Sequence, residues 1–153
     1  MGKDGTGLGR RTWIRIEGNN EIKTTVITVY SPCKPRKHGY YSTFAQQKGY
    51  WTINGIKECS RENFRKHPLE FIKLCKYKGD KIIIMLDGNE KMHTRKLTKA
   101  LNGKPYNMID ITMIKVGNLR FRMCNKCQEQ IDAIWISKDL EATKDTVLPL
   151  FLV

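Results

Sequence analysis

The apolar residues of this chain fall into short runs that are separated by turn residues. In the densest run, residues 82–86, five large apolar side chains follow one another, and three of them are Ile. Gly79-Asp80 precedes this run and Asp87-Gly88 follows it. An unbroken apolar run of this length predicts a strand that is buried on both faces of a layered sheet.

Polar residues follow this run directly. Asp87, Asn89 and Glu90 would bring two carboxylates and an amide to the carboxyl end of a central strand. Layered α/β sheets usually carry their chemistry at that edge. An Asp-Gly turn leaving a strand explains the same residues equally well, so both interpretations stay open on this stretch alone.

Two earlier segments have the pattern of strands. Residues 12–17 alternate between apolar and polar, and residues 23–30 are dense in β-branched side chains. Together they predict a hairpin. Tyr30 closes the second strand just before Ser31-Pro32, so it would share an edge with Asp87 if their two strands run parallel.

Later segments are less uniform. Residues 107–116 fit a strand or a helix, whereas residues 119–123 alternate as a strand does. Residues 130–137 form the last clear strand, and Asp132 stands in its otherwise apolar run. Because a buried carboxylate needs a partner, Asp132 either orients another polar group or lies at the rim of the sheet.

Helical spacing appears in three places, of which residues 43–48 and 94–101 are short. In the longest segment Ser60 can cap the helix, Pro68 is expected to start or kink its main stretch, and Gly79 ends it. This helix leads into the Ile-rich strand, as a crossover between parallel strands would. One face of it is apolar and consists of Leu69, Phe71, Ile72 and Cys75.

Length and composition indicate one globular domain. The chain has 153 residues, of which 40% are hydrophobic and 28% are charged, which excludes a disordered chain. The 28 Lys and Arg against 15 Asp and Glu give a net charge of +13. Such a domain is expected to meet polyanions, with nucleic acid as the first candidate and an acidic membrane surface as the second.

Basic and aromatic residues are interleaved in residues 34–51 and recur in 91–104. Basic side chains neutralise phosphates, and aromatic rings stack on unpaired bases. The plainer alternative, favoured for most of the rings, is that they pack under a helix while the charges are only solvated. The candidate nucleic-acid-binding residues are Lys34, Arg36, Lys37, Tyr40, Tyr41, Lys91, Arg95 and Lys96.

The five cysteines indicate an intracellular protein, nuclear or cytoplasmic. Their number is odd and no secretory leader precedes them, so reduced thiols are expected. No apolar run is long enough to span a bilayer, so no membrane-spanning segment is expected. Cys124 and Cys127 have metal-ligand spacing but lack a second pair, which argues against a zinc site.

Oxygen-bearing side chains at strand ends are the remaining chemical signal. Tyr30, Asp87, Asn89 and Asp132 form this set. Hard oxygen ligands suit Mg²⁺, and Mg²⁺ suits phosphate esters. A carboxylate beside an amide could orient a water for in-line attack while the amide steadies the developing charge.

Several motifs then follow in a familiar order. They are Gly-Leu-Gly-Arg, Trp-Ile-Arg, Val-Ile-Thr-Val-Tyr-Ser-Pro, Ile-Met-Leu-Asp-Gly-Asn-Glu and Gln-Ile-Asp-Ala-Ile-Trp-Ile-Ser. This order resembles the central part of the endonuclease/exonuclease/phosphatase superfamily, in the versions carried by retroelements. The resemblance covers residues 7–137 and leaves residues 138–153 as a divergent tail. It implies a partial four-layered α/β sandwich of the DNase I-like kind, without its first strands and its final strand.

The resemblance also implies roles for the oxygen-bearing set. Asp87 matches the acid that orients or deprotonates the attacking water and contacts the metal, which is Mg²⁺ or Mn²⁺ in this superfamily. Asn89 matches the amide that contacts the scissile phosphate, and Tyr30 matches a tyrosine that approaches it. Asp132 matches the acid that braces the catalytic histidine.

Departures from the family pattern limit this expectation. A metal-binding Glu expected before residue 7 is missing, and so is the histidine expected soon after Ser137. The sequence therefore predicts a truncated Mg²⁺-dependent, nuclease-like phosphodiesterase domain that is weakly active or inactive. The alternatives are a non-catalytic basic nucleic-acid-binding module, and a fragment whose bare sheet faces prevent stable folding.

Overall fold

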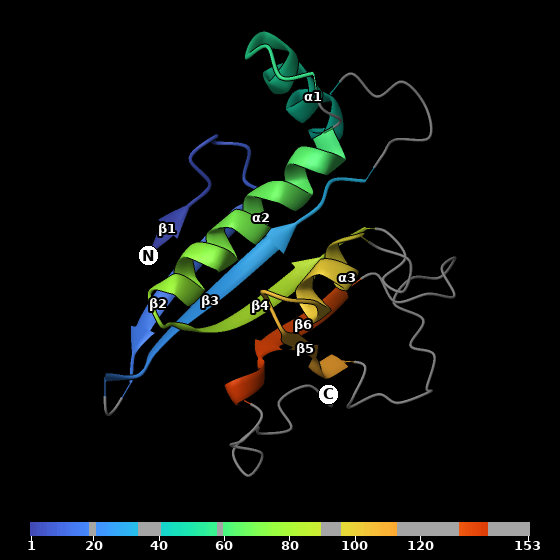
Figure 1. Cartoon of the computed structure of the whole chain (residues 1–153). Coiled ribbons are helices and arrows are strands. Elements are labelled where there is room, and N and C mark those ends of the chain that lie inside the picture. Colours follow the sequence, from blue (N-terminus) through green and yellow to red (C-terminus); the bar gives the residue numbers. More distant parts are fainter. Residues whose placement is uncertain (19–20, 34–40, 58–59, 90–95, 113–131, 141–153) are drawn as a thin grey trace, which may run out of the picture.

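The computed structural model describes residues 1–18, 21–33, 41–57, 60–89, 96–112 and 132–140. These residues form a mixed six-stranded sheet in the order β1-β2-β3-β4-β6-β5, together with three helices (Figure 1). The α/β fold class is confirmed. The strands are β1 (Gly2–Lys3), β2 (Arg11–Glu17), β3 (Lys23–Tyr30), β4 (Lys81–Asp87), β5 (Met108–Asp110) and β6 (Asp132–Ser137), and the helices are α1 (Thr43–Ile53), α2 (Ser60–Tyr77) and α3 (Lys96–Asn102). The strand expected at 119–123 lies outside the described residues.

The centre of the sheet is the parallel pair β3 and β4, as their sequence order with an intervening helix predicts. β2 pairs antiparallel with β3, which confirms the hairpin, and β6 pairs antiparallel with β4. α2 makes the crossover and packs on the sheet with α3. The sheet begins with β1, which precedes residue 7, because Gly2 and Lys3 pair with Trp13 and Thr12.

Helix α2 begins at Ser60 and continues through Pro68. The expectation that its main stretch starts at Pro68 is therefore wrong. A proline inside a helix removes one backbone hydrogen bond. Packing compensates, because Phe64 before the proline and Ile72 and Cys75 after it all lie in the core. Gly79 ends the helix with φ of 78°, a conformation that suits glycine.

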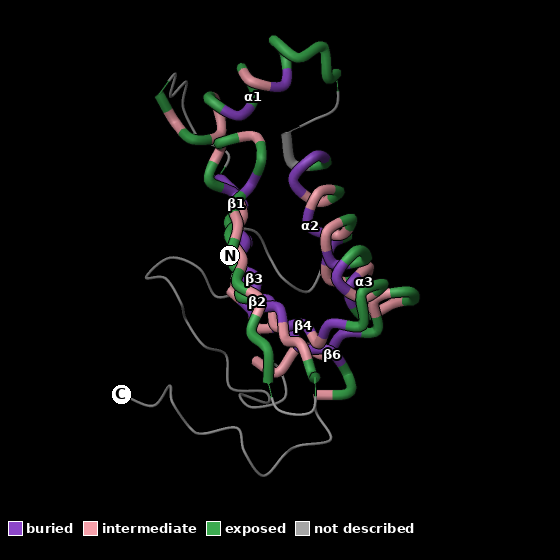
Figure 2. The backbone as a smooth tube through the Cα atoms, turned by 90° about the vertical axis from the view of Figure 1, so that its left-hand side faces the viewer, coloured by how far each residue is buried: buried purple, intermediate pink, exposed green. Residues whose placement is uncertain are grey.

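The Ile-rich strand β4 alternates, so the prediction that both of its faces are buried is wrong. Ile82, Ile84 and Leu86 are at most 3% exposed, whereas Met85 is 40% exposed. The helices α2 and α3 lie on one side of the sheet (Figure 2). Buried residues of the strands form one core with residues of these helices. We call the side that packs against these helices the covered face and the other side the open face.

A buried ion pair fixes the start of β4 against its neighbours. Asp80 accepts hydrogen bonds from Nη2 of Arg15 at 2.6 Å and from Oγ1 of Thr25 at 2.8 Å. Burial alone would raise the pKa of Asp80, but these two hydrogen bonds together with the charges of Arg15 and Lys78 hold the pKa below its ordinary value. One carboxylate thus joins β2, β3 and the turn that precedes β4.

Candidate functional site

Three of the four oxygen-bearing residues lie side by side at one edge of the sheet. Tyr30 at the end of β3 pairs with Asp87 at the end of β4, and Asp87 pairs with Asp132 at the start of β6. Paired residues on neighbouring strands point to the same face. All three therefore share the open face, in one row across three strands, which we call the edge row.

The three side chains of the edge row differ in their exposure. Tyr30 is 37% exposed, Asp87 is exposed, and Asp132 is partly buried. Cα atoms of cross-strand pairs lie about 5 Å apart, so both carboxylates are close enough to contact one small ligand. Asp132 stands at the first position of β6, at the rim of the sheet. The rim was one of the two placements that the sequence allowed for it.

Asn89 is held next to this row by the backbone of a neighbouring loop. Its Nδ2 donates to the carbonyl oxygen of Ser31 at 2.9 Å, and the Ser31 N–H donates to the carbonyl oxygen of Asp87 at 2.8 Å. Asn89 itself has a φ of 48°, which Asn tolerates better than most residues. The connections that leave β3 and β4 are therefore tied together, and one of the two N–H groups of the Asn89 amide is used in this contact.

The environment of Tyr30 keeps its hydroxyl group protonated. Partial burial raises the pKa of Tyr30, and electrostatic interaction with Cys33 and Asp87 raises it further. Its backbone N–H donates to the carbonyl oxygen of Arg10 at 2.9 Å. At neutral pH Tyr30 can thus donate a hydrogen bond to an oxyanion at the edge.

The donor set of the edge row fits a magnesium-type ion but not a closed metal cage. Among the described residues no three His, Cys, Asp or Glu side chains gather around one point. Mg²⁺ commonly takes one or two carboxylates and completes its shell with water and substrate phosphate. Asp87 and Asp132 meet that requirement, and their hard oxygens suit Mn²⁺ equally.

Most of the candidate nucleic-acid contacts cannot be placed. Lys34, Arg36, Lys37, Tyr40, Lys91 and Arg95 lie outside the described residues, as do Glu90 and the Cys124 and Cys127 pair. Tyr41 is 94% exposed just before α1, and Lys96 is exposed at the first position of α3. The aromatic rings of residues 41–51 differ in exposure. Tyr41 is solvated, whereas Trp51 is 3% exposed and lies in the interior.

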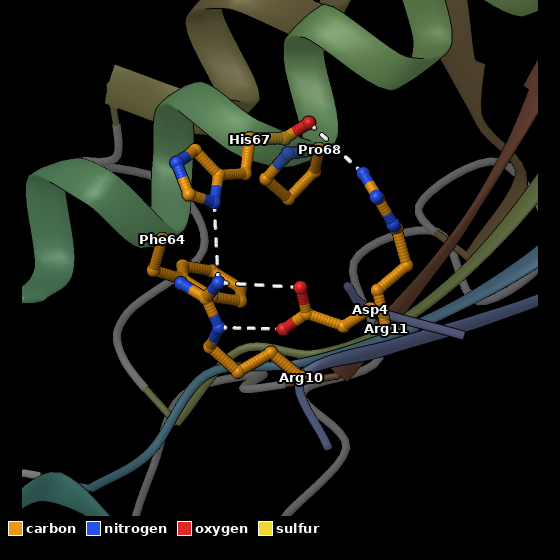
Figure 3. A pocket seen from close by; sticks show the side chains of 6 residues that line it. All are labelled: Asp4, Arg10, Arg11, Phe64, His67 and Pro68. Carbon is orange, nitrogen blue, oxygen red and sulfur yellow. Dashed lines mark hydrogen bonds and ion pairs between the residues drawn. The ribbon is translucent and has the colours of Figure 1, made fainter. Parts of the chain in front are cut away.

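A second polar cluster was not anticipated from the sequence. Arg10 is 3% exposed, and its Nε donates to Asp4 at 2.9 Å while its Nη2 contacts Thr6 at 3.2 Å and Nδ1 of His67 at 3.1 Å (Figure 3). The same guanidinium lies 4.7 Å from the ring centroid of Trp51. The Gly-rich segment, residues 5–9, is therefore part of a loop between β1 and β2 that these hydrogen bonds hold in place.

This cluster lies on the side of α2, away from the edge row. Together with Arg11, Phe64 and Pro68 it lines a small pocket. A guanidinium can only donate, so Nδ1 of His67 must accept the hydrogen bond and the ring is neutral. Burial lowers the pKa of His67, and the charge of Arg10 lowers it further. Sequence offered no signal for this contact, because Arg10 and His67 are far apart in the chain.

No helix in the described parts of the chain is long and apolar enough to cross a membrane. No protein-family model matches the sequence, and no curated protein matches it significantly. Among solved structures the chain is similar to the human Nocturnin catalytic domain, which was solved with a bound sulfate anion. The TM-score is 0.48 and the sequence identity 12%, over 84% of this chain and 41% of that one.

The chain thus spans less than half the length of the catalytic domain that it matches. A likeness of this size concerns the arrangement of helices and strands alone. The described residues form a mixed α/β fold with one six-stranded sheet.

Proposed function

We propose that the edge row is a phosphate-binding site of a Mg²⁺-dependent phosphodiesterase type, and that this chain binds nucleic acid there with little or no hydrolysis. The observation that carries the proposal is the alignment of Tyr30, Asp87 and Asp132 in one row, with Asn89 beside them. The four side chains bring two carboxylates, one protonated phenol and one amide to one rim. This is a donor set for a phosphate ester and its counter-ion.

The charged and the neutral residues of the edge would have different roles in binding. Asp87 and Asp132 would hold the divalent cation, which when bound neutralises phosphate charge and polarises the phosphorus–oxygen bonds. Tyr30 would donate a hydrogen bond to a non-bridging phosphate oxygen, as its raised pKa allows. Asn89 would donate the second N–H of its Nδ2 to the same phosphate, because the first already donates to the carbonyl oxygen of Ser31. Asp87, the more exposed carboxylate, is also the group placed to orient a water.

Catalysis is expected to be weak because the described residues of the edge include no histidine that could protonate the leaving oxygen. The one histidine in the described part of the chain, His67, packs on α2 against Arg10 and is turned away from the edge row. General acid catalysis commonly contributes about 10²–10⁴-fold to rate. The described carboxylates at this rim can position a phosphate and a water, but they leave this step unassisted.

The charge of the chain favours nucleic acid over a small phosphate ester. The net charge is +13, and a polyanion that neutralises several such charges gains affinity by releasing counter-ions. Tyr41 and Lys96 supply an exposed ring and an exposed cation for such a strand.

Metal binding at the edge row is the first test. Addition of Mn²⁺ to the 153-residue chain should broaden the NMR signals of Tyr30, Asp87 and Asp132 before those of residues on α2. Asp87→Ala should abolish this selective broadening. Glu70→Gln, which removes an exposed carboxylate from α2, should leave it unchanged. Broadening spread evenly over all exposed acids would refute the site.

Nicking of a supercoiled plasmid in Mg²⁺ is the second test. We expect a rate near the uncatalysed background in the wild type and in Asp87→Ala alike. Rapid nicking that Asp87→Ala abolishes would show that the chain is a full nuclease and that the expected weakness is wrong.

A non-catalytic basic binding module is the second candidate, favoured by the net charge and by exposed Tyr41. It differs from the first candidate in its dependence on the edge row. If it is correct, binding of single-stranded DNA will fall steeply with salt but will survive both EDTA and Asp87→Asn. Loss of affinity on either treatment favours the phosphate site at the edge row instead.

A further inference from the structure

Two neighbouring parts of the helix layer are rich in lysine and contain no acid. They are residues 71–77 of α2 and residues 96–107, which comprise α3 and the turn after it. Both helices pack on the covered face of the sheet (Figure 1). Nζ of Lys76 donates to the carbonyl oxygen of Tyr106, which joins the end of α2 to the turn after α3. The two parts therefore form one continuous surface.

Four lysines of this surface are exposed. Lys73 directly follows buried Ile72 on α2, and Lys99 stands between buried Leu97 and Leu101 on α3. Since these buried residues face the sheet, Lys73 and Lys99 point toward solvent on the other side of their helices. We use the name helix surface for the four exposed lysines together with Tyr77. The lysines are Lys73, Lys96, Lys99 and Lys104.

The charge of the helix surface is not balanced within the described part of the chain. None of its four lysines forms an ion pair with another described residue. Glu70, three residues before Lys73, is the nearest exposed acid along α2. One carboxylate against four ammonium groups leaves the surface positive. Repulsion among these groups costs free energy that a bound polyanion would remove.

Tyr77 adds an exposed aromatic ring to this charge. It is 90% exposed, and it lies four residues after Lys73, one turn along the same face of α2. Aromatic rings beside phosphate-binding cations stack on the unpaired bases of a single strand. The ring therefore favours a single-stranded nucleic acid over a duplex, whose bases are already stacked on one another.

An acidic membrane surface fits the helix surface less well than nucleic acid does. A helix that lies in a membrane interface inserts its apolar face between the lipids. The apolar face of α2 contains Ile72 and Cys75, that of α3 contains Leu97 and Leu101, and all four residues belong to the core of the protein. The helices thus have charge to offer a partner but no free apolar face.

We propose that the helix surface binds the phosphate backbone of a single-stranded nucleic acid, with one unpaired base stacked on Tyr77. Packed helices lie about 8–10 Å apart, so the long, flexible side chains of Lys73 and Lys99 can reach neighbouring phosphates of one strand. The helix surface is separate from the edge row and requires no metal ion. It would hold a strand whether or not the edge row binds a phosphate.

Loss of two lysines from the helix surface is the first test. Fluorescence anisotropy measures the binding of labelled oligothymidylate in EDTA, which removes any metal-dependent contribution of the edge row. The double variant Lys73→Gln/Lys99→Gln should raise the dissociation constant at least tenfold. The slope of log K against log salt concentration should become shallower by about 1.4, since each phosphate contact with a single strand contributes about 0.7.

A matched control removes the same charge elsewhere. Lys3 on β1 and Lys57 after α1 are exposed, and Lys3→Gln/Lys57→Gln should change the dissociation constant less than threefold. Circular dichroism melting shows whether both double variants fold. Equal losses of affinity in the two double variants would overturn the proposal, because the binding would then follow net charge and not this surface.

Substitution of Tyr77 tests the stacked base. Tyr77→Ala should raise the dissociation constant for oligothymidylate at least fivefold, whereas Tyr77→Phe, which keeps the ring, should change it less than twofold. Neither variant should affect the binding of a duplex. An unchanged affinity of Tyr77→Ala would overturn the assignment to a single strand. Binding to phosphatidylserine vesicles that the lysine variant loses, without binding to oligothymidylate, would assign the surface to a membrane instead.

The edge row and the helix surface can fail separately in these measurements. Asp87→Ala should leave the affinity in EDTA unchanged, because it acts only through the metal-dependent site. In Mg²⁺ it should weaken binding by the same factor in the wild type and in Lys73→Gln/Lys99→Gln. An effect of Mg²⁺ without any effect of the lysines would support the edge row and refute the helix surface.

Discussion

The covered face and the open face of the same strands differ sharply, although their sequences do not. On β4 the covered positions Ile82 and Ile84 are at most 2% exposed, whereas Met85 on the open face is 40% exposed. Both faces are rich in Ile and Val. The difference comes from α2 and α3, which cover one face only, so burial here is decided by the second layer and not by the strand.

Neighbouring isoleucines on β4 give the largest expected difference between the two faces. Ile82→Ala removes a side chain that is 0% exposed and should lower the free energy of unfolding by about 2–5 kcal/mol. Ile83→Ala, one residue along on the open face, should cost about 1 kcal/mol because little cavity remains. Urea unfolding of the two variants beside the wild type checks both values. Equal losses would mean that the open face is as buried as the covered one.

The ion pairs on the covered side provide the next comparison. Asp80→Ala removes a carboxylate that is 2% exposed and leaves Arg15, which is 32% exposed, without its partner. The free energy of unfolding should fall by about 2 kcal/mol. Glu17→Ala removes the exposed partner of Lys23 at 3.6 Å and should cost less than about 0.5 kcal/mol. Thermal melts of the two variants, side by side, measure the contrast.

A pH-dependent effect on the covered side is expected to be the smallest. The lowered pKa of His67 means that the unfolded chain binds a proton more readily than the folded one. Stability is therefore complete above about pH 6.5 and declines as the pH falls toward the lower folded pKa. Urea midpoints between pH 7.5 and 5 should show this decline in the wild type and lose most of it in His67→Gln. Asp4 and Asp80, whose pKa values are lowered, make stability depend on pH only near and below pH 4.

Local sequence predicted the elements well where a single signal dominated. β3 matches residues 23–30 because its side chains are densely β-branched, and Gly79 marks the end of α2. The parallel pairing of β3 and β4 followed from the helix between them. Burial of β4 was predicted wrongly, because an unbroken apolar run has the same appearance whether one layer or two cover the strand.

The candidate site shows the same division. Tyr30, Asp87 and Asp132 could be placed at strand ends from sequence, and parallel pairing then brings the first two to one edge. Their chemical roles stay predictions. The contacts around Arg10 could not be foreseen, because they join a loop to Trp51 and His67, and nothing local to any of the three residues indicates the others.

Arg10 links two layers through different atoms of one residue. Its carbonyl oxygen accepts from the backbone of Tyr30 at the edge row, while its guanidinium lies against Trp51 of α1 and His67 of α2. Movement of α1 would therefore pull on this side chain. The displacement would reach Tyr30 through the peptide unit of Arg10, so the position of the helix and that of the phenol would be mechanically coupled.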